Sequence, residues 1–435
     1  MIAFILADLR RFWSGAVAVI VLLALSVALS SVVTLQERAV RLGTARASDK
    51  FDLVIGAAGS DTQLTLSSVF LQPSPLPLMS GAILGKLAND TRVAFAAPIG
   101  FGDSAMGFPI VGTTTALISA LSPKLAEGTL FSRLGEAVIG SAVDLPVGAR
   151  VNPMHGTVET GGHAHNEVSY QVSGKMAPTG TAWDRSILVP IRTVWQLHGM
   201  EAHEEHDHAE HENANHDNDE RAAKSGNGFG ILVNETPHDH DHEIDVDAPL
   251  NEAFDADSPG VPAILVKPKT IADAYRLRQE YRSDRTLAIF PAEVLTRLYS
   301  TLGDARSLLL GIAVGTQVIV VFALLLVAVM HIGARKRQIG ALRALGAPVR
   351  SIMAIVWGEL FFLLLLGIFL GLGIGYAVAR AITSWLTATT AVRMPVEFAM
   401  SDVWLAIGFI AVAAVVALVP ALMTLRMSAA SALRS

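Results

Sequence analysis

Long apolar stretches alternate with polar segments along this chain, and four of them are long enough to cross a membrane. Each contains a run of about 20 residues or more without Asp, Glu, Lys or Arg, and about 20 apolar residues are needed for a helix to span a bilayer core of roughly 30 Å. The pattern therefore predicts four transmembrane helices, at residues 12–35, 307–331, 357–380 and 402–425.

The first apolar stretch also stands where a secretory signal peptide would stand. Its apolar run is longer than the usual signal-peptide core of about 7 to 15 residues. We therefore expect an uncleaved membrane anchor, with a cleaved signal peptide as the alternative.

Basic residues gather at one end of the predicted helices. Lys and Arg near helix ends are retained on the cytoplasmic side of a membrane. This rule predicts cytoplasmic N and C termini and a cytoplasmic segment between the second and third helices. The location that we expect is a bacterial inner (cytoplasmic) membrane. The residues that set the orientation are Arg10, Arg11, Arg335, Lys336, Arg337, Arg343, Arg350, Arg426 and Arg434.

The same topology places residues 36–306 outside the cytoplasm as one large domain. Short runs of β-branched and apolar residues bounded by Gly, Pro or Asp, such as DLVIG, FPIVG, EVSYQVSG and AILVKP, predict strands in it. The predicted fold is thus membrane α-helical, with an α+β extracytoplasmic domain inserted between helices 1 and 2. The other parts are a cytoplasmic N-terminus at 1–11, a cytoplasmic segment at 332–356, a short outer loop at 381–401 and a cytoplasmic tail at 426–435.

Glycines punctuate the third apolar stretch. Gly367 and Gly371 are one turn apart on one helix face, a spacing that permits close contact between membrane helices. Generic membrane packing is the plainer interpretation of the same pattern.

The segment between the second and third helices, ARKRQIGALRALGAPVRSIMAIVWGEL, has an amphipathic helical pattern. Ile339, Leu342, Leu345 and Val349 recur at three- and four-residue spacing, between arginines that supply a cationic surface. Such a helix can present a fixed face to a partner, and the alternative is a basic loop that only sets orientation.

This segment resembles that of the MacB/FtsX type of ABC transporter permease, the FtsX-like permease family with a MacB-like periplasmic domain. The family pattern R-x-x-x-I-G-x-L-R-A-L-G-A matches residues 335–347, and a Glu and a glycine-rich helix follow at Glu359 and 367–375. The segments FDLVIGAAGS, EAVIGSAV, VSGKMAPTGTAWDRSILVPI and the closing PALMTLRMSAASALRS resemble the family's periplasmic domain and tail.

The resemblance implies a homodimer or pseudo-dimer of permeases, each resting a cytoplasmic coupling helix on a separate ATPase subunit. ATP-driven closure of the ATPase would move the outer domain through stalk helices, here residues 35–50 and 296–306. The ATPase-coupling residues it implies are Arg335, Arg337, Ile339, Leu342, Arg343, Leu345 and Glu359.

The sequence predicts no catalytic residues and no ATP site of its own. Its nearest approach to a phosphate-binding loop, GAILGKLAN, has the wrong glycine spacing, and Leu87 stands where Ser or Thr would hold magnesium. A net charge of −6 gives no basic footprint for nucleic acid. The expected chain is a non-catalytic membrane subunit without cofactor, whose partner uses ATP.

A histidine- and acid-rich insert, residues 198–247, interrupts the outer domain. Its core, residues 201–220, holds five His and nine acidic residues and no Lys or Arg, a composition that buries too little apolar surface to fold alone. Imidazole and carboxylate groups bind Zn²⁺ and also Ni²⁺ or Cu²⁺, so we expect a metal-binding insert, with an inert solvated linker as the alternative. The candidate ligands are His203, His206, His208, His211, His216, His238, His240 and His242, to which His163 and His165 could add.

These features predict a permease subunit that couples ATP hydrolysis by a separate subunit to conformational change in the periplasm. We also expect a link to zinc or other divalent-metal handling. The alternatives are a drug or peptide efflux or lipoprotein-release permease, and a non-transporting FtsX-like regulator of a periplasmic partner. The expected partners are the ABC ATPase, a second permease copy, a periplasmic metal-binding or adaptor protein, and membrane lipid.

Overall fold

The computed structural model divides the chain into two compact units. It describes residues 13–72, 74–155, 163–164, 168–200, 244–334, 341 and 347–424. One unit, here the bundle unit, contains residues 1–42, 299–386 and 394–435, and the other, the outer unit, contains residues 43–298 and 387–393.

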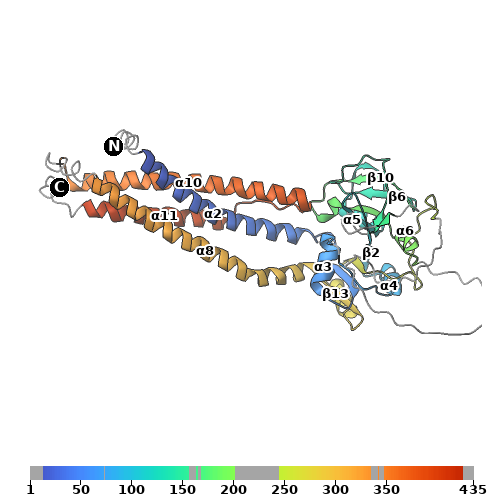
Figure 1. The fold of residues 1–435 in the computed structure, drawn as a ribbon. Coiled ribbons are helices and arrows are strands. Elements are labelled where there is room, and N and C mark those ends of the chain that lie inside the picture. The colour runs from blue at the N-terminus through green and yellow to red at the C-terminus, as the bar shows by residue number, and fades with distance from the viewer. Residues whose placement is uncertain are drawn as a thin grey trace, which may run out of the picture. The chain divides into compact units, whose positions relative to one another are not determined.

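Four long helices form the bundle unit, and Figure 1 shows them running side by side. All four are long and apolar enough to cross a membrane by length and composition. This confirms the predicted fold class, because the mixed helix-and-strand unit is inserted between the first and second of them. The helices are α2 (Trp13–Arg46), α8 (Pro291–Ala334), α10 (Val349–Thr390) and α11 (Met400–Met423).

The helices are longer than the apolar stretches that predicted them. α2 continues past Leu35 to Arg46, and α8 begins at Pro291, well before its apolar part. The prediction of a loop at 381–401 was wrong for its first half, because α10 runs on to Thr390. The residue after the helix, Ala391, has a left-handed φ of 57°, so the backbone conformation and not the end of the apolar run stops the helix.

In its described residues the outer unit has two sheets. The first is antiparallel, in the order β13-β1-β12-β2, and joins strands from both sides of the insert. Its strands are β13 (Thr286–Ile289), β1 (Leu53–Ala57), β12 (Ala263–Pro268) and β2 (Val93–Ile99).

The second sheet is mixed, because β10 pairs parallel with β6 and β11 pairs parallel with β4. Its order is β5-β10-β6-β11-β4-β3-β8-β9, with β7 (Arg150–Val151) paired to β10. The strands are β5 (Leu125–Gly128), β10 (Tyr170–Met176), β6 (Glu136–Ile139), β11 (Ile187–Pro190), β4 (Phe108–Thr113), β3 (Asp103–Ala105), β8 (Met154–His155) and β9 (His163–Ala164).

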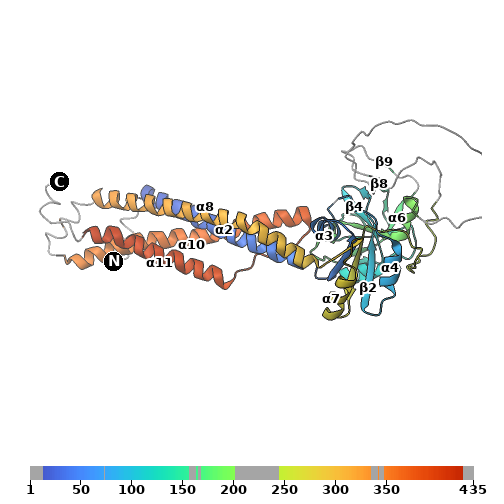
Figure 2. The ribbon, with the colours of Figure 1, turned by 90° about the horizontal axis from the view of Figure 1, so that it is seen from below.

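Short helices cover these sheets and complete the cores. Figure 2 shows α4 beside β2, in agreement with their packing. Trp195 packs edge-on against Phe254, with ring centroids 6.1 Å apart, in the core of the first sheet. The helices of the outer unit are α3 (Asp61–Phe70), α4 (Gly81–Ala88), α5 (Thr115–Leu121), α6 (Ile191–Leu197), α7 (Ile271–Glu280) and a 3-10 turn, η2 (Ala182–Arg185).

The segment that approached a phosphate-binding loop in sequence is helix α4, and its glycines serve packing. A side chain on Gly81 would lie 1.8 Å from the Ser258 carbonyl oxygen, and one on Gly85 would lie 2.3 Å from that of Asp255. The backbone at 255–258 therefore covers the face where a phosphate would have to approach.

An ion-pair network joins the start of β2 to α7. Arg92 Nη2 lies 2.6 Å from Asp90 Oδ2 and 2.8 Å from Glu280 Oε2. Hydrogen bonds from Arg92 lower the pKa of Asp90 below its usual value, against the opposing effect of burial.

We expect Asp90→Asn to lower the free energy of unfolding at pH 7 by about 1 kcal/mol. Because the folded-state pKa is depressed, this stability is present above the unfolded pKa of about 3.9 and is lost as pH falls through the folded value. Urea unfolding followed by tryptophan fluorescence at pH 7 and pH 3 measures it. A difference between the two proteins that stays constant over this range would contradict the assignment.

Candidate functional site in the helix bundle

One face of α10 is made of glycines and packs directly on α2. Gly367, Gly371 and Gly375 are spaced four residues apart and all three are buried. A side chain on Gly371 would lie 2.6 Å from the carbonyl oxygen of Ala24, and one on Gly375 would lie 2.7 Å from Cβ of Ser31. The two backbones therefore approach closely, which confirms the close contact predicted from Gly367 and Gly371.

The fourth glycine of this run is in different surroundings. A side chain on Gly373 would meet nothing within 4 Å. Two residues from Gly371 along a helix, it lies on another face. The glycine run thus contains three residues that pack on α2 and one, Gly373, that has space for a side chain.

Polar side chains link the four helices at separate levels. Ser26 of α2 donates a hydrogen bond of 2.5 Å to Gln317 of α8, and Trp357 Nε1 of α10 donates one of 3.1 Å to the Ala414 carbonyl oxygen of α11. Thr383 donates one of 3.3 Å to Gln36. Such bonds fix the register of helices that apolar contacts alone would leave free to slide.

The strongest polar contact joins α2 to the start of α11. Arg38 holds Asp402 bidentately, with Nη1 to Oδ2 at 2.6 Å and Nη2 to Oδ1 at 2.9 Å. The same guanidinium donates to the Glu397 carbonyl oxygen at 3.0 Å and to Ser401 Oγ at 2.9 Å. We call these four contacts the Arg38 clamp.

The clamp is partly buried and also completes a helix end. The Arg38 and Asp402 side chains are only 14% and 16% exposed, so water screens the pair weakly. Asp402 additionally accepts the Ala399 N–H at 2.9 Å, which satisfies a backbone donor at the first turn of α11. No pattern in the sequence predicted this pair. The available signal was that each is a charged residue next to an apolar stretch.

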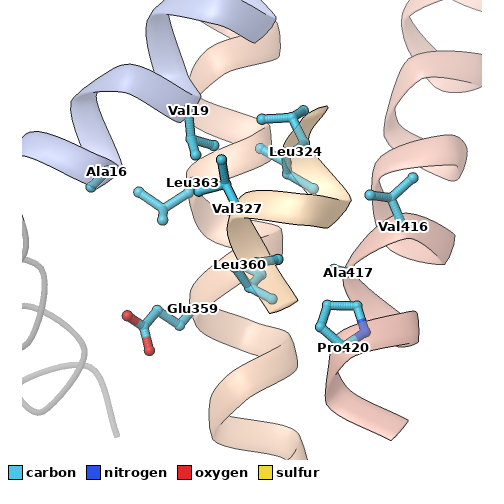
Figure 3. Close-up of a pocket in the computed structure, with 13 residues that line it drawn as sticks. Ala16, Val19, Leu324, Val327, Glu359, Leu360, Leu363, Val416, Ala417 and Pro420 are labelled. Atoms are coloured by element: carbon cyan, nitrogen blue, oxygen red, sulfur yellow. The ribbon is translucent and has the colours of Figure 1, made fainter. Parts of the chain in front are cut away.

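A small cavity of about 60 Å³ lies among all four helices. Its lining is apolar apart from Glu359, whose side chain is part of α10 and is 6% exposed. Figure 3 shows the carboxylate of Glu359 pointing away from Pro420 and the other apolar side chains. The carboxylate is therefore held at the margin of an apolar site formed by residues such as Ala16, Val19, Leu324, Leu363 and Val416.

The segment after α10 belongs to the outer unit and not to the bundle unit. Its Arg393 N–H donates a hydrogen bond of 2.8 Å to the Gly180 carbonyl oxygen. Gly180 has a left-handed φ of +73° and lies so close to Arg393 that a side chain there would be 3.0 Å from the arginine Cβ. Asp184 holds this turn by accepting the N–H groups of Thr179 and Gly180.

Comparison with known proteins assigns the bundle. A family model described as FtsX-like permease C-terminal matches residues 310–430, which contain α10, α11 and most of α8. Over these residues the chain is similar to the C-terminal part of FtsX-like permeases. This confirms the FtsX-like part of the prediction made from residues 335–347 and the glycine run, and the glycine face and Asp402 lie within the matched residues.

A solved structure is also similar to this chain, but only weakly. The periplasmic region of MacB from Actinobacillus actinomycetemcomitans is similar over 58% of this chain and 95% of that chain, with 9% identity and a TM-score of 0.29. At that TM-score the comparison carries no argument about the fold, so the description of the outer unit rests on its own strand pairing. No curated protein matches the chain in sequence.

Most of the residues predicted for coupling and for metal binding lie outside the residues that the structure describes. Of the coupling set only Glu359 is described, while Arg335, Arg337, Ile339, Leu342, Arg343 and Leu345 are not. The eight insert histidines and His165 are likewise outside, and for His163 the structure gives the backbone in β9. Among the described residues, no three His, Cys, Asp or Glu side chains converge.

Proposed function

We propose that this chain is the membrane subunit of a MacB/FtsX-type ABC transporter, in which a separate ATPase drives conformational change of the outer unit. The observation that carries the proposal is helix continuity. Residues 43–46 of α2, 291–298 of α8 and 387–390 of α10 are grouped with the outer unit, while the rest of each helix is in the bundle unit. A hydrogen-bonded helix resists axial compression, so a displacement at one end is carried to the other.

Anchoring of these helix segments within the outer unit supports the same function. At the start of α8, Glu293 pairs with Arg278 at 2.7 Å, and Arg297 reaches Asp61 at 3.7 Å. After α10, Arg393 is bonded to Gly180. Helices held in this way would move the outer unit's sheets with them rather than slide past them.

Between α8 and α10, we propose that residues 335–347 dock on the ATPase. Their arginines and apolar ridge suit a partner groove, and Glu359 lies in the helix that follows. This assigns both termini to the cytoplasm of a bacterium and the chain to its inner membrane, as a subunit with no catalytic residue of its own. Strongly exposed apolar side chains on α8, among them Leu308, Ile319 and Phe322, suit lipid or a second copy of the chain.

We expect Arg337→Ala combined with Ile339→Asp and Arg343→Ala to detach the ATPase subunit. Loss of two charges and of the apolar ridge should lower ATPase stimulation by the purified permease at least tenfold, a change of about 1.4 kcal/mol. Co-purification and phosphate release measure the effect, with Arg276→Ala as the control because that side chain is 71% exposed on the outer unit. Full stimulation by the triple variant would overturn the coupling role.

We further propose that the transporter is linked to zinc or another divalent metal. The support is the composition of residues 201–243 of the insert, whose eight histidines are interleaved with carboxylates. If so, Zn²⁺ should change ATP turnover of the complex, and replacing the eight insert histidines by asparagine should remove that response. A response that survives the replacement would show that the insert histidines do not mediate it, and the absence of any Zn²⁺ response in the parent complex would favour efflux or lipoprotein release.

A further inference from the structure

A second cavity in the bundle unit, of about 390 Å³, lies between α2, α8 and α11. A volume of this size falls within the range of about 300 to 1,000 Å³ that is typical of ligand sites. Well-packed protein interiors leave few voids larger than a water molecule. The cavity therefore has the size of a binding site and not that of a packing defect.

The wall of this cavity is almost wholly apolar. Among its lining residues, the polar ones are Ser30 and Thr34 of α2 and Gln317 of α8. The hydroxyl groups of Ser30 and Thr34 donate hydrogen bonds of 3.3 and 3.1 Å to carbonyl oxygens of their own helix. Gln317 accepts the hydrogen bond from Ser26. Because these side chains are already bonded within the protein, the space suits an apolar ligand.

The cavity reaches the surface of the bundle between α8 and α11. Val314 and Val318 of α8 and Val412 of α11 line it, and they are 63%, 48% and 48% exposed. All the lining residues lie within the stretches of α2, α8 and α11 that are apolar enough to cross a membrane. An apolar rim at this depth faces the acyl chains of the bilayer and not water, so a ligand enters from the bilayer.

The length of the cavity matches one leaflet of a bilayer. Its lining on α8 extends from Leu310 to Val321, which is a rise of roughly 16 Å along the helix axis. The apolar core of a bilayer is about 30 Å thick, so the cavity has the depth of half of that core. An extended acyl chain of one leaflet has this length.

Two smaller cavities continue the same line along α8. One of about 20 Å³ shares Gln317, Val321 and Phe409 with the large cavity. The cavity beside Glu359 shares Leu324 with that one, and Figure 3 shows Leu324 among its lining side chains. The space between the helices is therefore elongated, which suits a chain better than a compact ligand.

Positive charge follows one end of the cavity on α2. Arg38 and Arg41 come four and seven residues after Thr34, a spacing that puts all three on one face of the helix. Arg41 pairs with Glu37 at 3.6 Å and is 58% exposed. It lies roughly 10 Å beyond Thr34 along the helix axis, and a basic side chain at this level attracts a lipid phosphate.

We propose that this cavity binds one acyl chain of a phospholipid, which enters from the bilayer between α8 and α11 and keeps its phosphate near Arg41. The bound acyl chain contacts three helices and so holds α8 beside α2 and α11. The site goes beyond the proposed function, because it concerns a lipid ligand and not the coupling to the ATPase.

The test uses the full-length permease, delipidated in detergent and titrated with synthetic phosphatidylglycerol. Native mass spectrometry counts the lipid molecules that each permease molecule binds, and we expect one to bind more tightly than the rest. Ala313 lines the cavity and is 3% exposed, so Ala313→Phe fills the space and should weaken this binding about tenfold or more. Arg41→Ala should weaken it about fivefold, because one positive charge near the phosphate is lost.

Gly315→Phe is the matched control, because it puts the same side chain on α8 at a position where a Cβ meets nothing within 4 Å. We expect this variant to bind the lipid as the parent does. The lipid site is wrong if no molecule binds more tightly than the rest, or if Ala313→Phe and Gly315→Phe bind it equally. If Ala313→Phe does not fold, Val318→Trp at the rim, where the native side chain is 48% exposed, takes its place, and unchanged binding by that variant overturns the site as well.

Discussion

Gly371→Leu is expected to abolish stimulation of the ATPase, because the variant cannot keep α10 packed on α2. Even a single Cβ at this position would lie 2.6 Å from the Ala24 carbonyl oxygen and 2.8 Å from Cβ of Val27. The first of these neighbours is backbone and cannot rotate away. Overpacking of this kind costs about 1 to 3 kcal/mol, and here it also displaces the helix that leads to the outer unit.

Gly373→Leu is the matched control for this prediction. It introduces the same side chain into the same helix two residues away, where a Cβ meets nothing within 4 Å. We expect Gly373→Leu to retain ATPase stimulation and thermal stability in detergent, and Gly371→Ala to fall between the two leucine variants. Equal behaviour of the two leucine variants would show that the glycine face does not hold α10 against α2.

Arg38→Ala is expected to produce the second large effect, a loss of about 2 to 4 kcal/mol of stability, near the cost of breaking a buried ion pair. The substitution removes four hydrogen bonds and leaves Asp402 partly buried without its cation. Arg38→Lys should recover less than half of the loss, because an ammonium cannot bind both carboxylate oxygens in a planar fork. Reversible unfolding in detergent measures both values.

Two further variants separate the clamp from a general effect of charge. Arg41 lies on the same helix and is 58% exposed, with Glu37 at 3.6 Å, so Arg41→Ala should change stability by less than about 0.5 kcal/mol. The exchange Arg38→Asp with Asp402→Arg should recover part of the loss because it restores opposite charges. If Arg38→Ala and Arg41→Ala cost the same, the clamp has no special role.

The apolar pattern was sufficient to predict the membrane helices, and the reason is local. A helix satisfies its own backbone hydrogen bonds, so about 20 consecutive apolar residues specify a span without reference to the rest of the chain. The same locality made the four-residue spacing of Gly367 and Gly371 interpretable. It also explains why the end of α10 was misplaced, since residues 381–390 are polar enough for a loop yet remain helical.

Contacts between distant residues were not accessible in this way. Arg38 and Asp402 are 364 positions apart, and no periodicity relates them. The pairing of Leu188 with Val111 and Val138 depends on strand register, and a slip of one residue would turn every side chain of a strand to the other face. The docking of Arg393 beside Gly180 likewise depends on a left-handed turn whose neighbour comes from the far end of the chain.

By itself, the sequence determined the number of membrane helices, the inserted outer domain and the FtsX-type motif, because each depends only on the composition and spacing of residues that are close together in the chain. Only the tertiary structure decided which face of α10 meets α2, which charged residues clamp α11, and which turn of the outer unit binds the segment after α10. These are products of long-range packing, in which the side chains that meet are chosen by the path of the whole chain.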